Sequence, residues 1–182
     1  MKDFGEFINP TGYILRPMGT WEPGAGYLFG LTALVGLRRK RKQYEFTLDP
    51  VAPLTFRHPD GCFIQPDRHG LTDLASIPIQ LEPVAGARNQ YEPSVLVHDS
   101  VCREHGLYFS PQLEGPFTFS PVSSPDAHRL LRLCLRAEGA WVTTAGTWWG
   151  FVRTFGPRWN TRQANARLDR SETAGRKDCN EK

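Results

Sequence analysis

The 182-residue chain lacks the marks of several common classes of protein. Its four cysteines form no CxxC pair and have no even spacing, which argues against a disulfide or zinc framework and favours free thiols. The longest apolar stretch, residues 25–37, has thirteen residues, whereas a membrane span needs about 20. No basic, apolar leader opens the chain. We therefore expect no signal peptide and a location in a reducing cytoplasm.

Positive charge is concentrated in two places. The run of residues 38–42 carries +5 and the tail of residues 160–182 carries +2, so with a net charge of +3 the remainder is −4. A mildly acidic body argues against a broad nucleic-acid-binding face, and we expect no nucleic-acid partner. Beside the apolar residues 25–37, the run fits either an anionic membrane surface or a solvated turn. This basic run consists of Arg38, Arg39, Lys40, Arg41 and Lys42.

Turn residues and apolar periodicity predict an α+β fold, with a small N-terminal β-hairpin or sheet packed on about three C-terminal helices. Pro59-Asp60-Gly61, between two apolar runs, predicts a hairpin turn. We expect an irregular arm over residues 1–45, one α+β domain over residues 46–159, and a disordered polar tail over residues 160–182. The expected strands are 44–50, 53–58 and 62–65, and the expected helices are 93–108, 123–139 and 140–155.

Polar side chains stand among apolar ones in three segments. The first is Leu-Thr-Asp-Leu-Ala-Ser-Ile-Pro at residues 71–78, the second is the His-Asp pair at residues 98–99, and the third is a helix start. A histidine paired with a buried carboxylate is a general base near neutral pH, and a serine or a bound water would then be the nucleophile. The candidate catalytic residues are Asp73, Ser76, His98, Asp99 and Asp126.

A metal centre is the second interpretation of the same residues. On a helix, His98, Cys102 and His105 lie at i, i+4 and i+7, which is one face. Imidazole and thiolate ligands at that spacing can hold a divalent metal, and Asp73 would be a further ligand or would orient His98. The candidate metal ligands are therefore His98, Asp73 and Cys102.

A purely structural interpretation stays open beside both of these. A carboxylate in a turn, as at Asp73, commonly accepts backbone N–H bonds and does nothing else. His98 would then be a core histidine that donates to Asp73. Asp126 has a sufficient explanation as the acidic residue of a helix N-terminus.

The order of these motifs resembles a family of small phage and prophage proteins known as domain of unknown function 1353. In that family a Gly-aromatic-x-Thr-Asp-x-Ala-Ser-x-Pro segment precedes a His-Asp helix and an Ala-Asp helix, and the resemblance spans residues 46–159. This chain departs from the pattern at three positions, where Leu71 replaces an aromatic residue, Cys102 replaces a tyrosine and Pro125 replaces a small residue. The family's polar signature falls on Thr72, Asp73, Ser76, Pro78, His98, Asp99 and Asp126.

The resemblance implies a phage or prophage origin and a gene near tail or lysis functions. One hypothesis is an accessory hydrolase with an Asp/His centre, which acts on cell-wall material. The alternative is a non-catalytic tail or neck component, joined to other phage proteins through its N-terminal arm and C-terminal tail. Both imply a location in the host cytoplasm during infection or in the virion.

Overall fold

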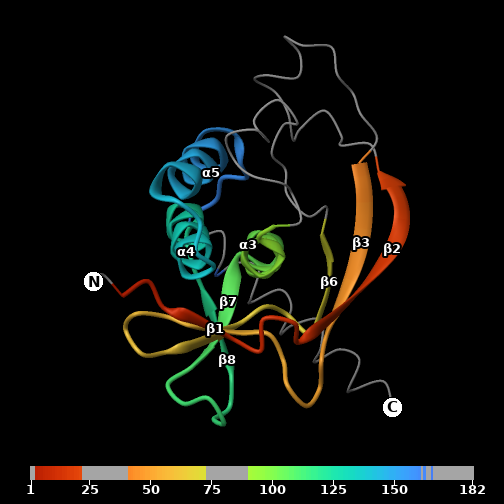
Figure 1. Cartoon of the computed structure of the whole chain (residues 1–182), viewed down its shortest axis with the longest axis vertical. Helices are drawn as coiled ribbons and strands as arrows, with labels where there is room; N and C mark the ends of the chain where they lie inside the picture. Colours follow the sequence, from red (N-terminus) through yellow and green to blue (C-terminus); the bar gives the residue numbers. More distant parts are fainter. Residues whose placement is uncertain (1–2, 22–40, 73–89, 161, 163–164, 166–182) are drawn as a thin grey trace.

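The computed structural model describes residues 3–21, 41–72, 90–160, 162 and 165, and Figure 1 draws the rest as a thin grey trace. Within these ranges the chain forms two antiparallel sheets and three helices, with most of the strands in the N-terminal half. The prediction of an α+β fold is therefore confirmed. The β part is larger than the predicted hairpin, because strands far apart in the sequence pair with one another.

The larger sheet has five strands in the order β1-β4-β5-β7-β8. Its β4–β5 hairpin confirms the predicted turn, since the N–H of His58 donates to the carbonyl of Cys62 (2.8 Å) and Gly61 adopts a φ of 89°. The strands of this sheet are β1 (Glu6–Ile8), β4 (Thr55–Arg57), β5 (Phe63–Gln65), β7 (Gly106–Ser110) and β8 (Thr118–Pro121).

The smaller sheet has three strands in the order β2-β3-β6. They are β2 (Tyr13–Trp21), β3 (Arg41–Leu48) and β6 (His69–Thr72). Strand β2 pairs with β3 over eight residue pairs, from Tyr13 with Leu48 to Trp21 with Arg41. The residues predicted to form an irregular arm thus supply β1 and β2, and their Gly and Pro content is tolerated because the partner strands fix the backbone. The predicted strand 44–50 begins earlier, at Arg41, and ends at Leu48.

The helices are α3 (Glu92–Glu104), α4 (Ser124–Ala137) and α5 (Val142–Phe155). The last two agree with the expected ranges within two residues, and Pro125 lies in the first turn of α4 as predicted. The expected helix 93–108 is too long. His105 adopts a left-handed φ of 59°, which ends α3 at Glu104, and the next residues form β7.

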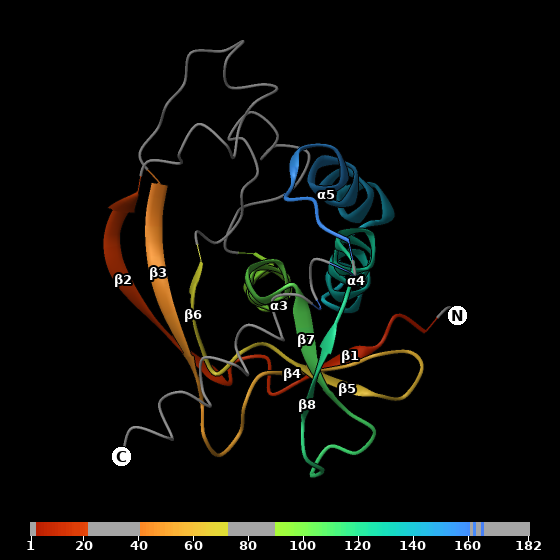
Figure 2. The same ribbon diagram turned by 180° about the vertical axis from the view of Figure 1, so that it is seen from behind.

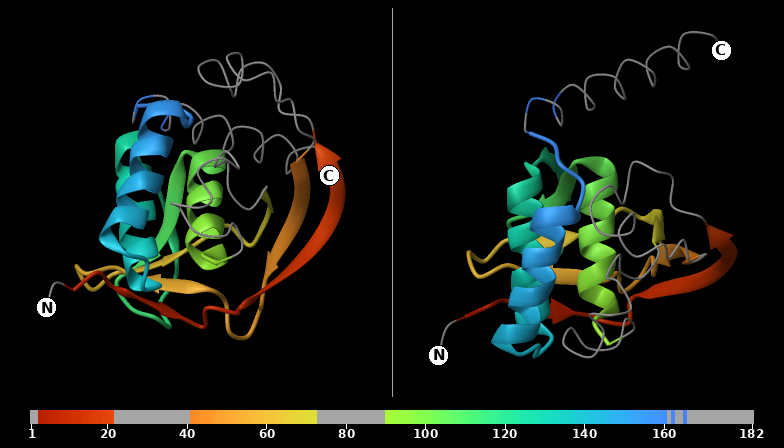
Figure 3. Two further views of the ribbon diagram at one scale, coloured as in Figure 1. Left: turned by 45° about the horizontal axis from the view of Figure 1, so that its top comes forward. Right: turned by 90° about the horizontal axis from the view of Figure 1, so that it is seen from above.

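Helix α3 lies at the centre of the fold. Figure 1 shows α3 between β6 of the smaller sheet and α4, with α5 packed above α4. The view from behind gives the same order (Figure 2), and Figure 3 shows the three helices side by side. One apolar core joins both sheets to α3 and α4 around Phe46, Phe56 and Leu96, and a second lies between the helices around Leu135 and Trp148.

The two sheets meet at Gly12, between β1 and β2. Its carbonyl accepts the N–H groups of Asp49 and Leu54, both at 3.0 Å. A Cβ on Gly12 would lie 2.1 Å from the carbonyl oxygen of Ala52, so only glycine fits here. The chain passes from one sheet to the other at this point twice, between β1 and β2 and between β3 and β4.

Glu138, which follows α4, gives a pH dependence of stability. Its carboxylate accepts the backbone N–H of Ser94 (3.0 Å) and the Ser94 hydroxyl. Burial nevertheless raises the pKa of Glu138 from 4.5 to about 6. The folded state therefore binds this proton more tightly than the unfolded state, and the associated stability is lost as pH rises through about 6.

Other groups titrate in the same range, so the effect of Glu138 is a difference between two proteins. We expect the free energy of unfolding of wild type, taken relative to that of E138Q, to fall by about 1 kcal/mol between pH 4.5 and pH 7. Urea unfolding of both proteins at the two pH values measures it. E6Q, which changes an exposed glutamate of β1, serves as the matched control and should keep the wild-type fall. A fall of the same size in E138Q would contradict the assignment.

Candidate functional site

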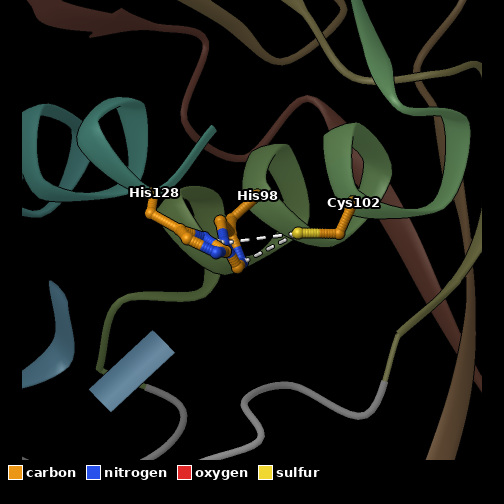
Figure 4. Close-up of side chains that lie close together, drawn as sticks. All are labelled: His98, Cys102 and His128. Carbon is orange, nitrogen blue, oxygen red and sulfur yellow. Dashed lines mark hydrogen bonds between the residues drawn. The ribbon is translucent and has the colours of Figure 1, made fainter. Parts of the chain in front are cut away.

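The site brings together two residues of α3 and one of α4. His98 and Cys102 lie four residues apart on α3, so both side chains leave the same face of the helix. His128 comes from the first half of α4, which packs against α3. Figure 4 shows the three side chains converging. His98 Nε2 lies 3.1 Å from His128 Nδ1 and 3.4 Å from Cys102 Sγ.

A carboxylate occupies the other side of the His98 ring. Asp99 Oδ1 lies 3.7 Å from His98 Nδ1, and the hydroxyl of Thr72 donates to Asp99 Oδ2 at 2.6 Å. Thr72 is the last residue of β6, so this hydrogen bond also ties the smaller sheet to α3. At 3.7 Å the carboxylate is within ion-pair range of Nδ1 but beyond hydrogen-bond distance, so it can attract a charged His98 ring. Cys102 Sγ lies nearer to Nε2 (3.4 Å) than to Nδ1 (3.9 Å).

The cluster is buried on one side and reaches the surface on the other. His98 and His128 are 7% and 3% exposed, while Cys102 and Asp99 are half-buried. Trp159 covers the site from the C-terminal segment, where its ring lies edge-on to His128 and stacks on His105 with centroids 4.6 Å apart. Among the described residues, the partly exposed side of the cluster is therefore that of Cys102 and Asp99.

The two histidines differ in their affinity for protons. Burial disfavours a charge on His98, but an ionised Cys102 and the Asp99 carboxylate outweigh burial and raise the pKa of His98 to about 10. Burial and a cation on His98 together lower the pKa of His128 to about 4. One imidazolium beside one neutral imidazole is the charge state that follows near neutral pH.

Some of the predicted site residues lie together in the structure, and others do not. It brings His98, Asp99 and Cys102 together, with Thr72 beside them. Asp73 and Ser76 lie outside the described residues, so their contacts with His98 stay predictions. His105 does not join His98 and Cys102, because α3 ends before it.

Asp126 is also apart from the cluster. It is exposed in the first turn of α4, where it accepts the Ser123 hydroxyl at 2.6 Å and pairs with Arg129 at 2.9 Å. Of the predicted contact run, Arg38, Arg39 and Lys40 lie outside the described residues. Arg41 and Lys42 begin β3, where their backbones pair with Trp21 and Thr20.

Sequence reasoning missed His128. The available signal was helical spacing, since residues 128, 131 and 135 lie on one face of α4 and all three are buried. A histidine on a face otherwise formed by leucines needs a polar partner inside the protein. That argument would have selected His128 as a companion for another buried polar group.

Two kinds of chemistry fit these residues. A thiol, an imidazole and a carboxylate that lie next to one another in space can carry out nucleophilic acyl transfer. Two imidazoles and a thiolate can also ligate a metal, since one donor atom from each of His98, Cys102 and His128 lies within 4.8 Å of the others.

Comparison with known proteins gives a family and no activity. Residues 51–152, more than half of the chain, match the model of a family described as "Protein of unknown function (DUF1353)". No curated protein matches the chain, and no solved structure matches it. Among the described residues, no helix combines the length and apolar character needed to cross a membrane.

Proposed function

The chain belongs to the DUF1353 family of proteins of unknown function, and from that premise we propose that it is a small hydrolase of acyl bonds. The proposed nucleophile is Cys102, with His98 as its proton-transfer partner and Asp99 as the group that orients His98. The observation that carries the proposal is the position of the His98 ring next to both groups, with Cys102 Sγ 3.4 Å from Nε2 and 3.9 Å from Nδ1, and Asp99 Oδ1 3.7 Å from Nδ1.

The geometry supports a two-step reaction. The Cys102 thiolate attacks the carbonyl carbon, the bond to the leaving group breaks, and Nε2 of the His98 imidazolium gives its proton to that group. A water molecule then attacks the thioester and passes a proton back to Nε2, while Sγ leaves as thiolate. The pKa of His98, raised to about 10 by Cys102 and Asp99 against the effect of burial, favours the imidazolium that begins this cycle.

The substrate proposed is a peptide amide of the bacterial cell wall, in a phage or prophage tail or lysis context. That context rests on the motif resemblance. The motif pattern of the family usually has tyrosine at the position of Cys102, so thiol chemistry is proposed for this chain and not for the family as a whole. Serine at residue 76 is not required as a nucleophile in this mechanism.

Hydrolysis of purified peptidoglycan, measured as released amino groups, tests the proposal. We expect C102S and H98Q to lose at least about 100-fold in rate. D126N should keep the wild-type rate, because Asp126 pairs with Ser123 and Arg129 away from the cluster. C62S controls for loss of a half-buried thiol elsewhere. Hydrolysis by C102S at the wild-type rate would overturn the mechanism.

A second candidate function is assembly with other phage proteins. The observation in its favour is the start of α5, where Trp141 and Val142 are 78% and 60% exposed. Large exposed apolar side chains side by side are typical of protein contact surfaces. Co-sedimentation with particles of the encoding phage should be weaker for W141S than for wild type, and equal co-sedimentation would count against this candidate.

A further inference from the structure

Beyond the hydrolase, we propose that His98, Cys102 and His128 bind one divalent transition-metal ion of the zinc type. The donors would be His98 Nε2, Cys102 Sγ and His128 Nδ1. All three side chains lie on the packed helices α3 and α4, two of them four residues apart on one helix. Figure 4 shows their donor atoms directed at one another.

Two of the three distances between donor atoms are close to those around a tetrahedral ion, and the third, between Cys102 and His128, is at most 4.8 Å. Zinc lies about 2.0–2.1 Å from nitrogen and about 2.3 Å from sulfur, so two ligating nitrogens are about 3.3 Å apart and a nitrogen and a sulfur are about 3.6 Å apart. The observed separations are 3.1 Å for His98 Nε2 to His128 Nδ1 and 3.4 Å for His98 Nε2 to Cys102 Sγ. Small side-chain rotations would therefore admit the ion.

Hydrogen bonds alone cannot satisfy all the polar atoms of His98, Cys102 and His128 in this arrangement. His98 Nε2 faces both His128 Nδ1 and Cys102 Sγ, and a single hydrogen on Nε2 can point at only one of them. On its far side, the buried Nε2 of His128 makes no hydrogen bond of good geometry among the described residues, although the ring interacts with the backbone of Pro157. A metal ion would use the three converging lone pairs at once, which compensates for burying two imidazoles.

A suitable outer shell is also present. Histidines that bind a metal through one nitrogen commonly donate the other N–H to a carboxylate, which fixes the tautomer. Asp99 stands at Nδ1 of His98 and is itself held by Thr72. Two nitrogens and one sulfur select zinc-like or copper-like ions over magnesium and calcium, which prefer oxygen ligands. Three protein ligands leave the fourth position to water or another small ligand.

One consequence rests on the proposed function. Cys102 Sγ cannot ligate a metal and attack a carbonyl at the same time, so a bound zinc ion would inhibit thiol hydrolysis. The metal site itself does not depend on this, because ion binding is measured without any substrate.

Titration of the purified full-length protein with Co²⁺, followed by absorption spectroscopy, tests the site. We expect one equivalent to bind, with a thiolate-to-cobalt charge-transfer band and the visible bands of a tetrahedral ion. C102S should lose the charge-transfer band, and H128Q should bind at least about 100-fold more weakly. C62S and C179S are the matched controls and should retain both features. Thermal unfolding without metal verifies that each variant is folded.

Wild-type protein without a charge-transfer band at one equivalent would overturn the metal site, whatever the variants do. Equal cobalt spectra in wild type and C102S would overturn it as well. Binding of Co²⁺ without any hydrolase activity would leave the metal site standing and count against the proposed function. Hydrolysis by a protein that binds no Co²⁺ would overturn the metal site and leave the proposed function standing.

Discussion

Replacing Trp159 with alanine is expected to lower the free energy of unfolding by about 3–5 kcal/mol. The Trp159 side chain is 5% exposed, and its Nε1 donates to the carbonyl of Val122 at 2.7 Å. Its backbone N–H donates to the Ser124 hydroxyl, and its carbonyl accepts both the hydroxyl and the N–H of Ser124. The substitution therefore removes core packing and leaves the partly buried Val122 carbonyl without its side-chain donor.

Urea unfolding followed by circular dichroism measures this loss. W141A is the matched control, because Trp141 is 78% exposed and its replacement should change stability by no more than about 0.5 kcal/mol. The same experiment reports on the site, since Trp159 contacts His105 and His128. A loss in W159A as small as that in W141A would mean that the C-terminal segment does not hold α4 in place.

Replacing Gly12 with alanine is expected to destabilise the protein by about 3 kcal/mol. The added Cβ would meet main-chain atoms, namely the carbonyl oxygen of Ala52 at 2.1 Å and the nitrogen of Leu54 at 2.6 Å. A clash with backbone cannot be relieved by a side-chain rotation. The shift would also break the hydrogen bonds that the Gly12 carbonyl accepts from Asp49 and Leu54.

The same substitution at Gly146 should have the opposite sign. Gly146 lies within α5, and a Cβ there would meet nothing within 4 Å. Alanine at this position should stabilise the protein by about 0.5–1 kcal/mol, because it lowers the entropy of the unfolded chain. Thermal unfolding of G12A and G146A, with wild type beside them, gives both values. Equal effects in the two variants would contradict a steric cause at Gly12.

The sequence was sufficient to predict those features that depend only on residues close together in the chain. The turn at Pro59-Asp60-Gly61 and the start of α4 at Ser124-Pro125 depend on residues a few positions apart, and both were predictable. Strands β1 and β2 were not. Glu6 pairs with Arg57 and Tyr13 with Leu48, so their conformation is decided by partners tens of residues away.

The site residues also fall into those that local sequence predicts and those that depend on packing between helices. His98 and Cys102 could be placed on one helix face from their spacing alone, and the structure brings them together. The third member, His128, comes from another helix, and its contact with His98 depends on how α3 packs against α4. His105 was expected on the same face, but the left-handed residue that ends α3 is His105 itself.

The crossing of the chain at Gly12 has a consequence for folding. Both the β1–β2 and the β3–β4 connections change sheets there, and the Gly12 carbonyl bonds to both sides of the second connection. Neither sheet can therefore complete its strand pairing while the other stays open. We expect the two sheets to melt in a single cooperative transition, with one midpoint for the amide groups of both.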